Sequence, residues 1–402
     1  MRAVLIGLGL TLTLTTSPAL AATSGQALEP LRVSPVRDGR LFVAEPSSLL
    51  QVPSTEIACG GQPIQPLYAD DLAVGAVRSA AHERPAVVLT FSVDAQGRTR
   101  DIRPAPDGPS NPTGPIIIPQ LNPAEAEQAA LAAWRFQAAP RADCRATIRY
   151  STKPLEAATT DDLLRYFAVT RTRGALRDIV ARRLGGPGAD CGSDGRGGRA
   201  ARTISVPDFK IGRRPPPGGR SWTVVRWNVN AAGRATGVET LGSSGDIDLD
   251  REARRAVADT VLRPGAPLTG CVFNFNRIGD TLPAPDMPAP DQDPQQVCPA
   301  DISDRLRLTV APERFPAAFA KRRIEGWALI RFDLATWGQT GALEVIDAQP
   351  AATFGEDGRR MIGSARAEAA PTAAVRCVVP IRYLLPVAAS GPEATRDDVA
   401  TD

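Results

Sequence analysis

The stretch Trp327-Ala328-Leu329-Ile330-Arg331-Phe332-Asp333-Leu334, followed by Ala335-Thr336-Trp337-Gly338, decides the fold of this chain. A strand-like run of apolar residues leads into a loop that ends on glycine, the residue that tolerates positive φ, and this pattern predicts a β-hairpin. The same pattern occurs at residues 86–93 before Gly97 and at residues 222–229 before Gly233. A second strand-like run and a helical stretch follow each loop. The sequence therefore predicts three copies of one small module.

The helical stretches are expected near residues 122–134, 248–262 and 354–370. In the first, Asn122 can cap the helix, Pro123 suits the first helical position and Glu125 completes a capping box. Gly358 and Gly363 weaken the third by about 1 kcal/mol each relative to alanine. We predict an α+β fold of three tandem modules. Each has an antiparallel three-stranded sheet in the order strand-strand-helix-strand, one helix packed on it and one disulfide.

Six cysteines follow the repeat, because each module carries one pair about 80 residues apart. Six cysteines allow 15 connectivities, and the repeat selects one of them. The predicted disulfides are Cys59 to Cys144, Cys191 to Cys271 and Cys298 to Cys377. Closing a loop of this length stabilises a module by about 4 kcal/mol in the chain-entropy model. That contribution is large for a module whose core is marginal.

The first residues have the pattern of an export signal. Arg2 precedes an apolar run over residues 3–14, and Ser17-Pro18-Ala19-Leu20-Ala21-Ala22 is typical of a signal peptidase site. We predict a cleaved signal peptide over residues 1–21, which agrees with cysteines used as disulfides. The alternative is an uncleaved inner-membrane anchor, although the apolar run is shorter than the ~20 residues of a spanning helix.

The amino-acid composition indicates where linkers separate the modules. The net charge of +3 on 402 residues gives no indication of nucleic-acid binding. Residues 283–290 are rich in proline and read as a stiff linker. Residues 161–184 carry apolar side chains at helical spacing, with arginines opposite. We favour a helix that packs its apolar face against the protein and leaves its arginines in solvent. A basic helix that lies on an anionic surface is the alternative. The predicted divisions are modules at 22–155, 191–280 and 298–390, a helical linker at 156–190, a Pro-rich linker at 281–297 and a disordered tail at 391–402.

Catalytic and metal-binding patterns are weak. His82 is the single histidine, no partner for it is suggested, and there is no Cys-x-x-Cys pair. The run Gly242-Ser243-Ser244-Gly245 lacks the nucleophile-elbow spacing. Asp246-x-Asp248-x-Asp250 begins like a calcium loop, but Arg251 takes the glycine position, so helix capping explains it better. We predict no catalytic, cofactor-binding or metal site, no small-molecule substrate, and a protein that is not an enzyme. An uncharacterised periplasmic hydrolase is the least favoured alternative.

The third module resembles a known family. Phe315-Pro316, then Arg323-Ile324-Glu325-Gly326, the hairpin and the helix resemble the TonB C-terminal domain. In the first module Trp134-Arg135-Phe136 is similar to the family's helix end, whereas Ala365-Arg366-Ala367 departs from it in the third. The resemblance implies a periplasmic protein-binding module, not an enzyme, whose last strand is an open edge. It also implies a role in TonB-dependent transport, although no proton-coupled anchor or long Pro-Lys spacer is visible.

The partner implied by the resemblance is the N-terminal segment of an outer-membrane receptor, which would add a strand to the open edge by β-augmentation. The corresponding last strands are residues 144–151, 271–278 and 377–385. Pro380 removes one backbone donor from the third of these strands. A structural or adaptor protein of the cell envelope, with no receptor role, is the alternative. The candidate peptide-binding residues are Val378, Val379, Ile381, Arg382 and Tyr383.

Overall fold

The computed structural model describes residues 49–70, 85–106, 124–169, 174–289, 295, 298, 315–367 and 374–386. They all belong to one compact unit, Pro46–Asp402. The predicted signal peptide, the cap at Asn122, His82 and the predicted tail lie outside the described residues. No described helix is long and apolar enough to cross a membrane.

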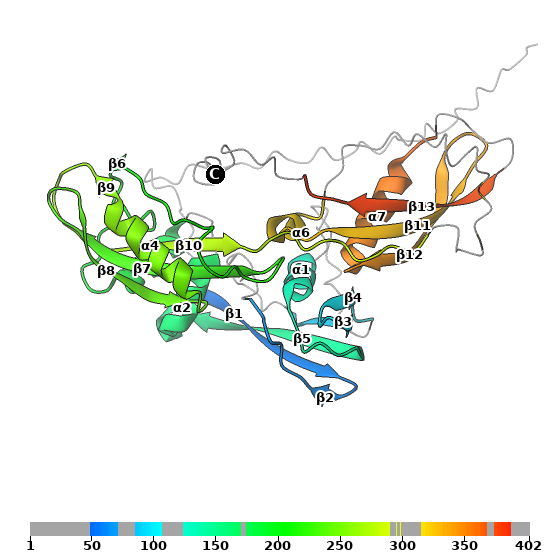
Figure 1. Ribbon diagram of the computed structural model, residues 1–402, viewed down its shortest axis with the longest axis horizontal. Helices are drawn as coiled ribbons and strands as arrows, with labels where there is room; N and C mark the ends of the chain where they lie inside the picture. Colours follow the sequence, from blue (N-terminus) through cyan, green and yellow to red (C-terminus); the bar gives the residue numbers. More distant parts are fainter. Residues whose placement is uncertain are drawn as a thin grey trace, which may run out of the picture. The chain divides into compact units, whose positions relative to one another are not determined.

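The first module has a five-stranded antiparallel sheet in the order β2-β1-β5-β3-β4. Its hairpin is β3 (Val87–Val93) with β4 (Thr99–Pro104), and α1 (Glu125–Ala133) precedes the last strand, β5 (Arg141–Pro154). The two additional strands, β1 (Leu49–Cys59) and β2 (Gln62–Pro63), come before the hairpin in the sequence. The predicted strand-strand-helix-strand order is therefore present, with two strands added to it (Figure 1).

The second and third modules have three-stranded sheets, and the α+β fold class is confirmed. In the second, the sheet order is β10-β7-β8, and in the third it is β12-β11-β13. The second contains β7 (Arg220–Val229), β8 (Ala235–Ser243), α4 (Ile247–Asp259) and β10 (Leu268–Ile278), with a short ribbon of β6 (Ala201–Thr203) and β9 (Val261–Leu262). The third contains α6 (Ala317–Arg322), β11 (Gly326–Leu334), β12 (Thr340–Gln349), α7 (Ala352–Ser364) and β13 (Val375–Tyr383).

The turn glycines have the role that the sequence predicts. Gly97, Gly233 and Gly338 adopt φ values of 75°, 83° and 80°. Each lies against the segment that follows the module's helix, because a Cβ on Gly97 would come within 2.2 Å of the Phe136 carbonyl oxygen. The glycine carbonyl in turn accepts a hydrogen bond from that segment, for example from the Phe136 N–H at 2.9 Å. The hairpin turn therefore holds the helix end in each module.

The three sheets share one register. An aromatic residue of the first hairpin strand lies opposite the closing cysteine: Phe91 faces Cys144, Trp227 faces Cys271 and Phe332 faces Cys377. The three disulfides expected from the repeat are present, with sequence separations of 85, 80 and 79 residues. Each disulfide therefore ties the segment that opens a module to its last strand.

Helix boundaries differ in places from those expected. The third helix, α7, ends at Ser364, because Arg366 then bridges to Gln339 beside the turn glycine. The helical stretch between the first two modules is two helices, α2 (Thr160–Val169) and α3 (Ala175–Gly185). Their apolar faces pack in one cluster with Trp222, Val224 and Val272 of the second module. This packing agrees with the prediction that the apolar face of this segment packs against the protein.

The modules share hydrophobic cores. Buried residues of the first and third modules, from Leu89 to Tyr383, form one continuous cluster. Leu50 of β1 belongs to the cluster that α2 and α3 build on the second module. The Pro-rich segment also contacts the third module, since the Trp327 indole donates to the Pro285 carbonyl at 2.9 Å. The three modules therefore do not have three separate cores.

Candidate strand-addition edges

The last strand of the first module is not an open edge. β1 pairs antiparallel with β5 over eleven consecutive residue pairs, from Leu49 opposite Pro154 to Cys59 opposite Cys144. The expectation of an open edge at residues 144–151 is therefore wrong for this module. The chain's own upstream segment already forms an added strand there (Figure 1).

Side chains of β5 show how an added strand is held. Ile148 and Tyr150 point into the core, and the Tyr150 hydroxyl donates to the Glu127 carboxylate of α1. Arg149 lies between them in sequence and is exposed. Its Nη1 lies 2.7 Å from Oε2 of Glu56 on β1. The β5 strand thus uses alternate side chains for the core and for the added strand.

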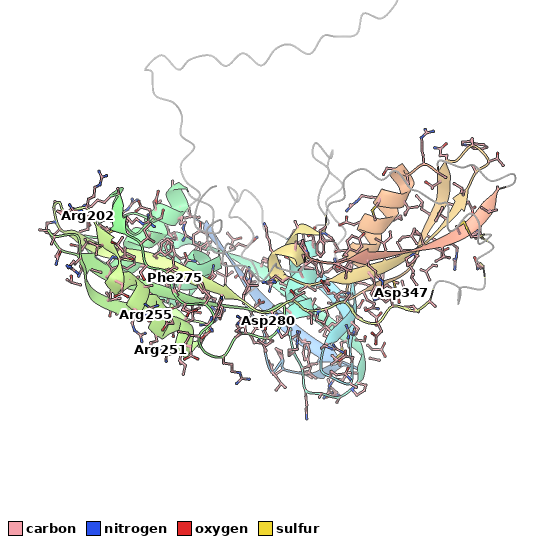
Figure 2. All side chains as sticks on the ribbon, turned by 45° about the horizontal axis from the view of Figure 1, so that its top comes forward. Arg202, Arg251, Arg255, Phe275, Asp280 and Asp347 are labelled. Carbon is pink, nitrogen blue, oxygen red and sulfur yellow. A yellow bond between two sulfur atoms is a disulfide. The ribbon has the colours of Figure 1, made fainter. Side chains whose placement is uncertain are left out.

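In the second module, β10 pairs with β7 on one side only, and no other described strand pairs with it. Its faces are covered, however. Asn274 and Asn276 both donate through Nδ2 to the Ala168 carbonyl at the end of α2, at 3.0 and 3.1 Å. On the other face lies α4, whose Ala253 and Val257 pack in one cluster with Cys271 of β10. Its Arg251 and Arg255 point outward (Figure 2). An added strand here would meet helices beside both faces of the sheet.

A buried arginine fixes α3 to this strand. Arg177 donates to the Phe167 carbonyl and to Oδ1 of Asn274, both at 2.7 Å, and its guanidinium stacks over the Phe167 ring. Burial lowers the pKa of Arg177 to about 10, although Tyr166 and Asp178 oppose this shift. The group remains charged at neutral pH and holds the helices on β10.

In the third module, β13 pairs with β11, and no other described strand pairs with it. Val378 is 8% exposed and packs near Ala284 and Met287 of the Pro-rich segment. Val379 and Ile381 are half-buried against the α7 side of the sheet. Tyr383 is buried, and its hydroxyl donates to the Phe354 carbonyl at 3.1 Å. Arg382 alone among the five predicted binding residues is exposed.

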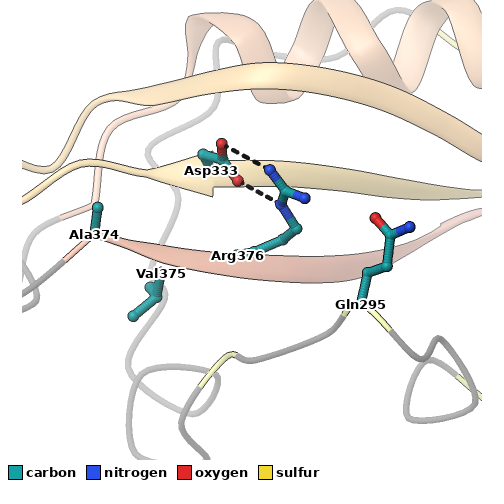
Figure 3. A pocket seen from close by; sticks show the side chains of 5 residues that line it. All are labelled: Gln295, Asp333, Ala374, Val375 and Arg376. Atoms are coloured by element: carbon teal, nitrogen blue, oxygen red, sulfur yellow. Dashed lines mark hydrogen bonds and ion pairs between the residues drawn. The ribbon is translucent and has the colours of Figure 1, made fainter.

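The start of β13 borders a pocket of about 470 Å³ (Figure 3). Gln295, Asp333, Ala374, Val375 and Arg376 line it. Asp333 accepts two hydrogen bonds from the Arg376 guanidinium, at 2.8 and 3.2 Å. These bonds hold the pKa of Asp333 below its usual range. Both the pocket and the Cys298 to Cys377 disulfide lie at the first half of β13, so its second half is the less covered part.

A shared triplet was missed by the sequence reasoning. Ile148-Arg149-Tyr150 and Ile381-Arg382-Tyr383 stand at the same offset from their closing cysteines. They also share a register, since Ile148 lies opposite Val87 and Ile381 opposite Ala328 in the corresponding hairpin strands. Aligning the repeats on their cysteines would have found the triplet. Arg149 and Arg382 are therefore equivalent residues of two last strands, one covered by β1 and one to which no second described strand is paired.

Asp246, Asp248 and Asp250, which are spaced like the start of a calcium loop, form hydrogen bonds within the second module. Asp246 caps α4, because its Oδ1 accepts the Leu249 N–H at 3.0 Å. Asp248 accepts the Arg213 N–H, and this bond first, then Arg251, holds the Asp248 pKa below its usual range. Asp250 accepts a hydrogen bond from Ser243. Within the described ranges, no group of three or more His, Cys, Asp or Glu residues could hold a metal ion.

Among the comparisons with known proteins, the one with solved structures gives a match. No family model matches the chain. No curated protein matches it. Among solved structures, the chain is similar to the solution NMR structure of the Pseudomonas aeruginosa TonB CTD, with 19% identity over 20% of this chain and 85% of that chain and a TM-score of 0.19. This weak likeness covers one fifth of the chain and leaves function to be argued from the edges described above.

Proposed function

We propose that this chain is a non-enzymatic periplasmic protein that captures extended peptide segments by adding them as a strand to β13. The observation that carries the proposal is the pairing of β1 with β5, because it is strand addition within the same chain, on a strand equivalent to β13. Three disulfides agree with an oxidising compartment. The N-terminal segment of an outer-membrane receptor is the proposed partner.

Strand addition suits the physical character of this edge. An edge strand has unpaired N–H and C=O groups, and an extended peptide gains main-chain hydrogen bonds to them whatever its side chains are. Pro380 lies opposite Leu329 within β13 and has no N–H to offer. The edge is therefore selective as well as open, because a bound segment makes its hydrogen bonds around that position.

A structural or adaptor role in the cell envelope is the second candidate. The shared core of the first and third modules favours it, since Phe319 and Phe354 of the third module lie in one cluster with Leu131 of the first. Modules fused in this way suit a rigid scaffold. In that case the edges would be covered in the cell by parts of the same chain or by a fixed neighbour.

The test is site-specific photo-crosslinking in the native host, with the probe at Arg382 on β13 and, as a matched control, at the equivalent Arg149 on β5. Mass spectrometry identifies the adducts. We expect adducts from the Arg382 probe to the N-terminal segment of an outer-membrane receptor. The Arg149 probe lies beside β1 and should give adducts only within the chain. Intramolecular adducts alone at both positions would reject peptide capture and support the scaffold role.

A further inference from the structure

The strand that covers the first module specifies what an added strand looks like. β1 runs antiparallel to β5, and Glu56 lies opposite Thr147. From there its carboxylate reaches diagonally to Arg149, whose own opposite residue is Ser54. Diagonal neighbours across an antiparallel pair are within reach of long side chains. One acidic side chain in a fixed register therefore accompanies the main-chain pairing.

The third module has the same basic residue without the acid. Arg382 is equivalent to Arg149, and Pro380 to Thr147, by their offsets from the closing cysteines. Arg382 is exposed, and no carboxylate of the described residues pairs with it. The other arginine of β13, Arg376, is already paired with Asp333. Within the described residues, the second half of β13 thus has a positive charge with no carboxylate partner beside a strand edge with no paired strand.

The segment that precedes the third module differs from β1 in sequence. The eleven residues that end at Cys298 include Pro288, Pro290 and Pro294, whereas the eleven residues of β1 include only Pro53. Proline has no N–H to donate to a strand ladder. Gln295 stands where β1 has Glu56, so the position equivalent to Glu56 is not acidic, although Asp291 and Asp293 lie earlier in the stretch. It is therefore a poor equivalent of β1, and the edge suits a strand from another protein.

We propose that the second half of β13 binds an extended, antiparallel segment of a partner protein, in which an acidic side chain lies opposite Pro380 and pairs with Arg382. The inference rests on the proposed function and adds the charge and register of the ligand to it. Partners with a neutral or basic residue at that position bind more weakly. The ion pair sets selectivity, and the main-chain hydrogen bonds supply most of the affinity.

The test uses the full chain and a fluorescent synthetic peptide with the β1 sequence, residues 49–58, read by anisotropy. The β5 edge is covered, so the peptide reports on uncovered edges. We expect Arg382→Gln to weaken binding about fivefold and Arg382→Glu to weaken it further, in the range of an exposed ion pair. A peptide with Glu56→Lys should recover binding to the Arg382→Glu chain. Arg149→Gln, the same change on the covered strand, is the matched control and should have no effect.

The possible failures are distinguishable. The peptide could bind while Arg382→Gln behaves like Arg149→Gln and the charge swap recovers no binding. In that case the proposed pairing of an acidic residue with Arg382 is wrong, while strand addition stands. If neither peptide binds the unmodified chain at millimolar concentration, both this inference and peptide capture are rejected. Circular dichroism of each variant checks that the fold is intact, as expected for the exposed side chain of Arg382.

Discussion

At the scale of single residues, the three hairpin turns form a natural mutation series. The first residue of each turn is Asp94, Asn230 or Ala335, and its backbone makes the same two hydrogen bonds in every module. Asp94 Oδ1 accepts the Arg98 N–H at 2.9 Å, and Asn230 Oδ1 accepts the Arg234 N–H at 3.0 Å. Ala335 has no side-chain acceptor. The third turn therefore lacks one hydrogen bond that the others have.

Replacing Ala335 by asparagine should supply the missing acceptor. We expect Ala335→Asn to raise the free energy of unfolding by about 1 kcal/mol, the net value of one intramolecular hydrogen bond. Thermal unfolding measures it, with Thr336→Asn at the next position as control. A loss of stability in Ala335→Asn would show that the third turn is not equivalent to the other two.

Asp94 should also make stability depend on pH. Partial burial would raise its pKa, but hydrogen bonds from the Arg98 and Gln96 N–H groups and the charges of Arg100 and Arg98 outweigh this and hold it below its usual range. A lowered pKa in the folded state gives stability that is present above the unfolded pKa of about 3.9 and lost as pH falls through the folded value.

Comparison with Asp94→Asn isolates this effect, because asparagine keeps the acceptor and does not titrate. We expect the variant to be less stable than the unmodified chain at pH 7 and the difference to shrink below about pH 4. Chemical unfolding at a series of pH values measures it. A difference that stays constant across the series would mean that the Asp94 charge does not stabilise the fold.

At the scale of elements, the first module depends on a strand that comes from upstream of its hairpin. β1 pairs with β5 along its whole length, and the Cys59 to Cys144 disulfide joins the last of these residue pairs. On its other side β1 pairs only at Ala58 and Cys59, with the short β2, among the described strands, and the disulfide keeps it in place. The covered state of β5 is thus fixed by a covalent bond as well as by hydrogen bonds.

Removal of this disulfide should weaken the module and loosen β1. For Cys59→Ser with Cys144→Ser we expect a loss of about 4 kcal/mol in the chain-entropy model. Amide hydrogen exchange should become faster in β1 than in β3, which stays paired on both sides. The double variant Cys298→Ser with Cys377→Ser is the matched comparison in the third module. Unchanged exchange in β1 would show that hydrogen bonds alone retain it.

At the scale of the whole molecule, one buried carboxylate joins the three modules. Asp70 of the first module pairs with Arg322 of the third, and both side chains are at most 4% exposed. Arg220 of the second module lies 3.7 Å from the same carboxylate. The Tyr68 hydroxyl donates to the Arg220 carbonyl at 2.9 Å, and burial raises the pKa of Tyr68 well above its usual range.

Loss of the Asp70 charge should therefore destabilise the whole unit. Asp70→Asn leaves the Arg322 guanidinium buried without a counter-charge, and we expect a loss of about 3–5 kcal/mol. The control is Asp280→Asn, which removes an ion pair with Arg214 from a carboxylate that is 66% exposed (Figure 2). Exposed pairs contribute about 0–1 kcal/mol. Denaturant unfolding measures both, and equal losses would contradict a buried junction.

The sequence by itself determined the features that depend on local spacing. Three hairpins were predictable because each strand and its partner lie within one short stretch, and turn glycines such as Gly338 mark where positive φ is required. The repeat of the cysteines was enough to select the disulfides. The cap at Asp246 was also predictable, because a capping side chain acts on the next three residues.

Only the tertiary structure decided which edges are covered. β1 reaches β5 across about 90 residues of chain, and the pairing uses main-chain groups that are the same in every residue, so no local pattern reveals it. The same holds for Asp70, whose partners Arg220 and Arg322 come from the other two modules. A candidate edge strand can be found in the sequence, but its exposure depends on which distant segment packs against it.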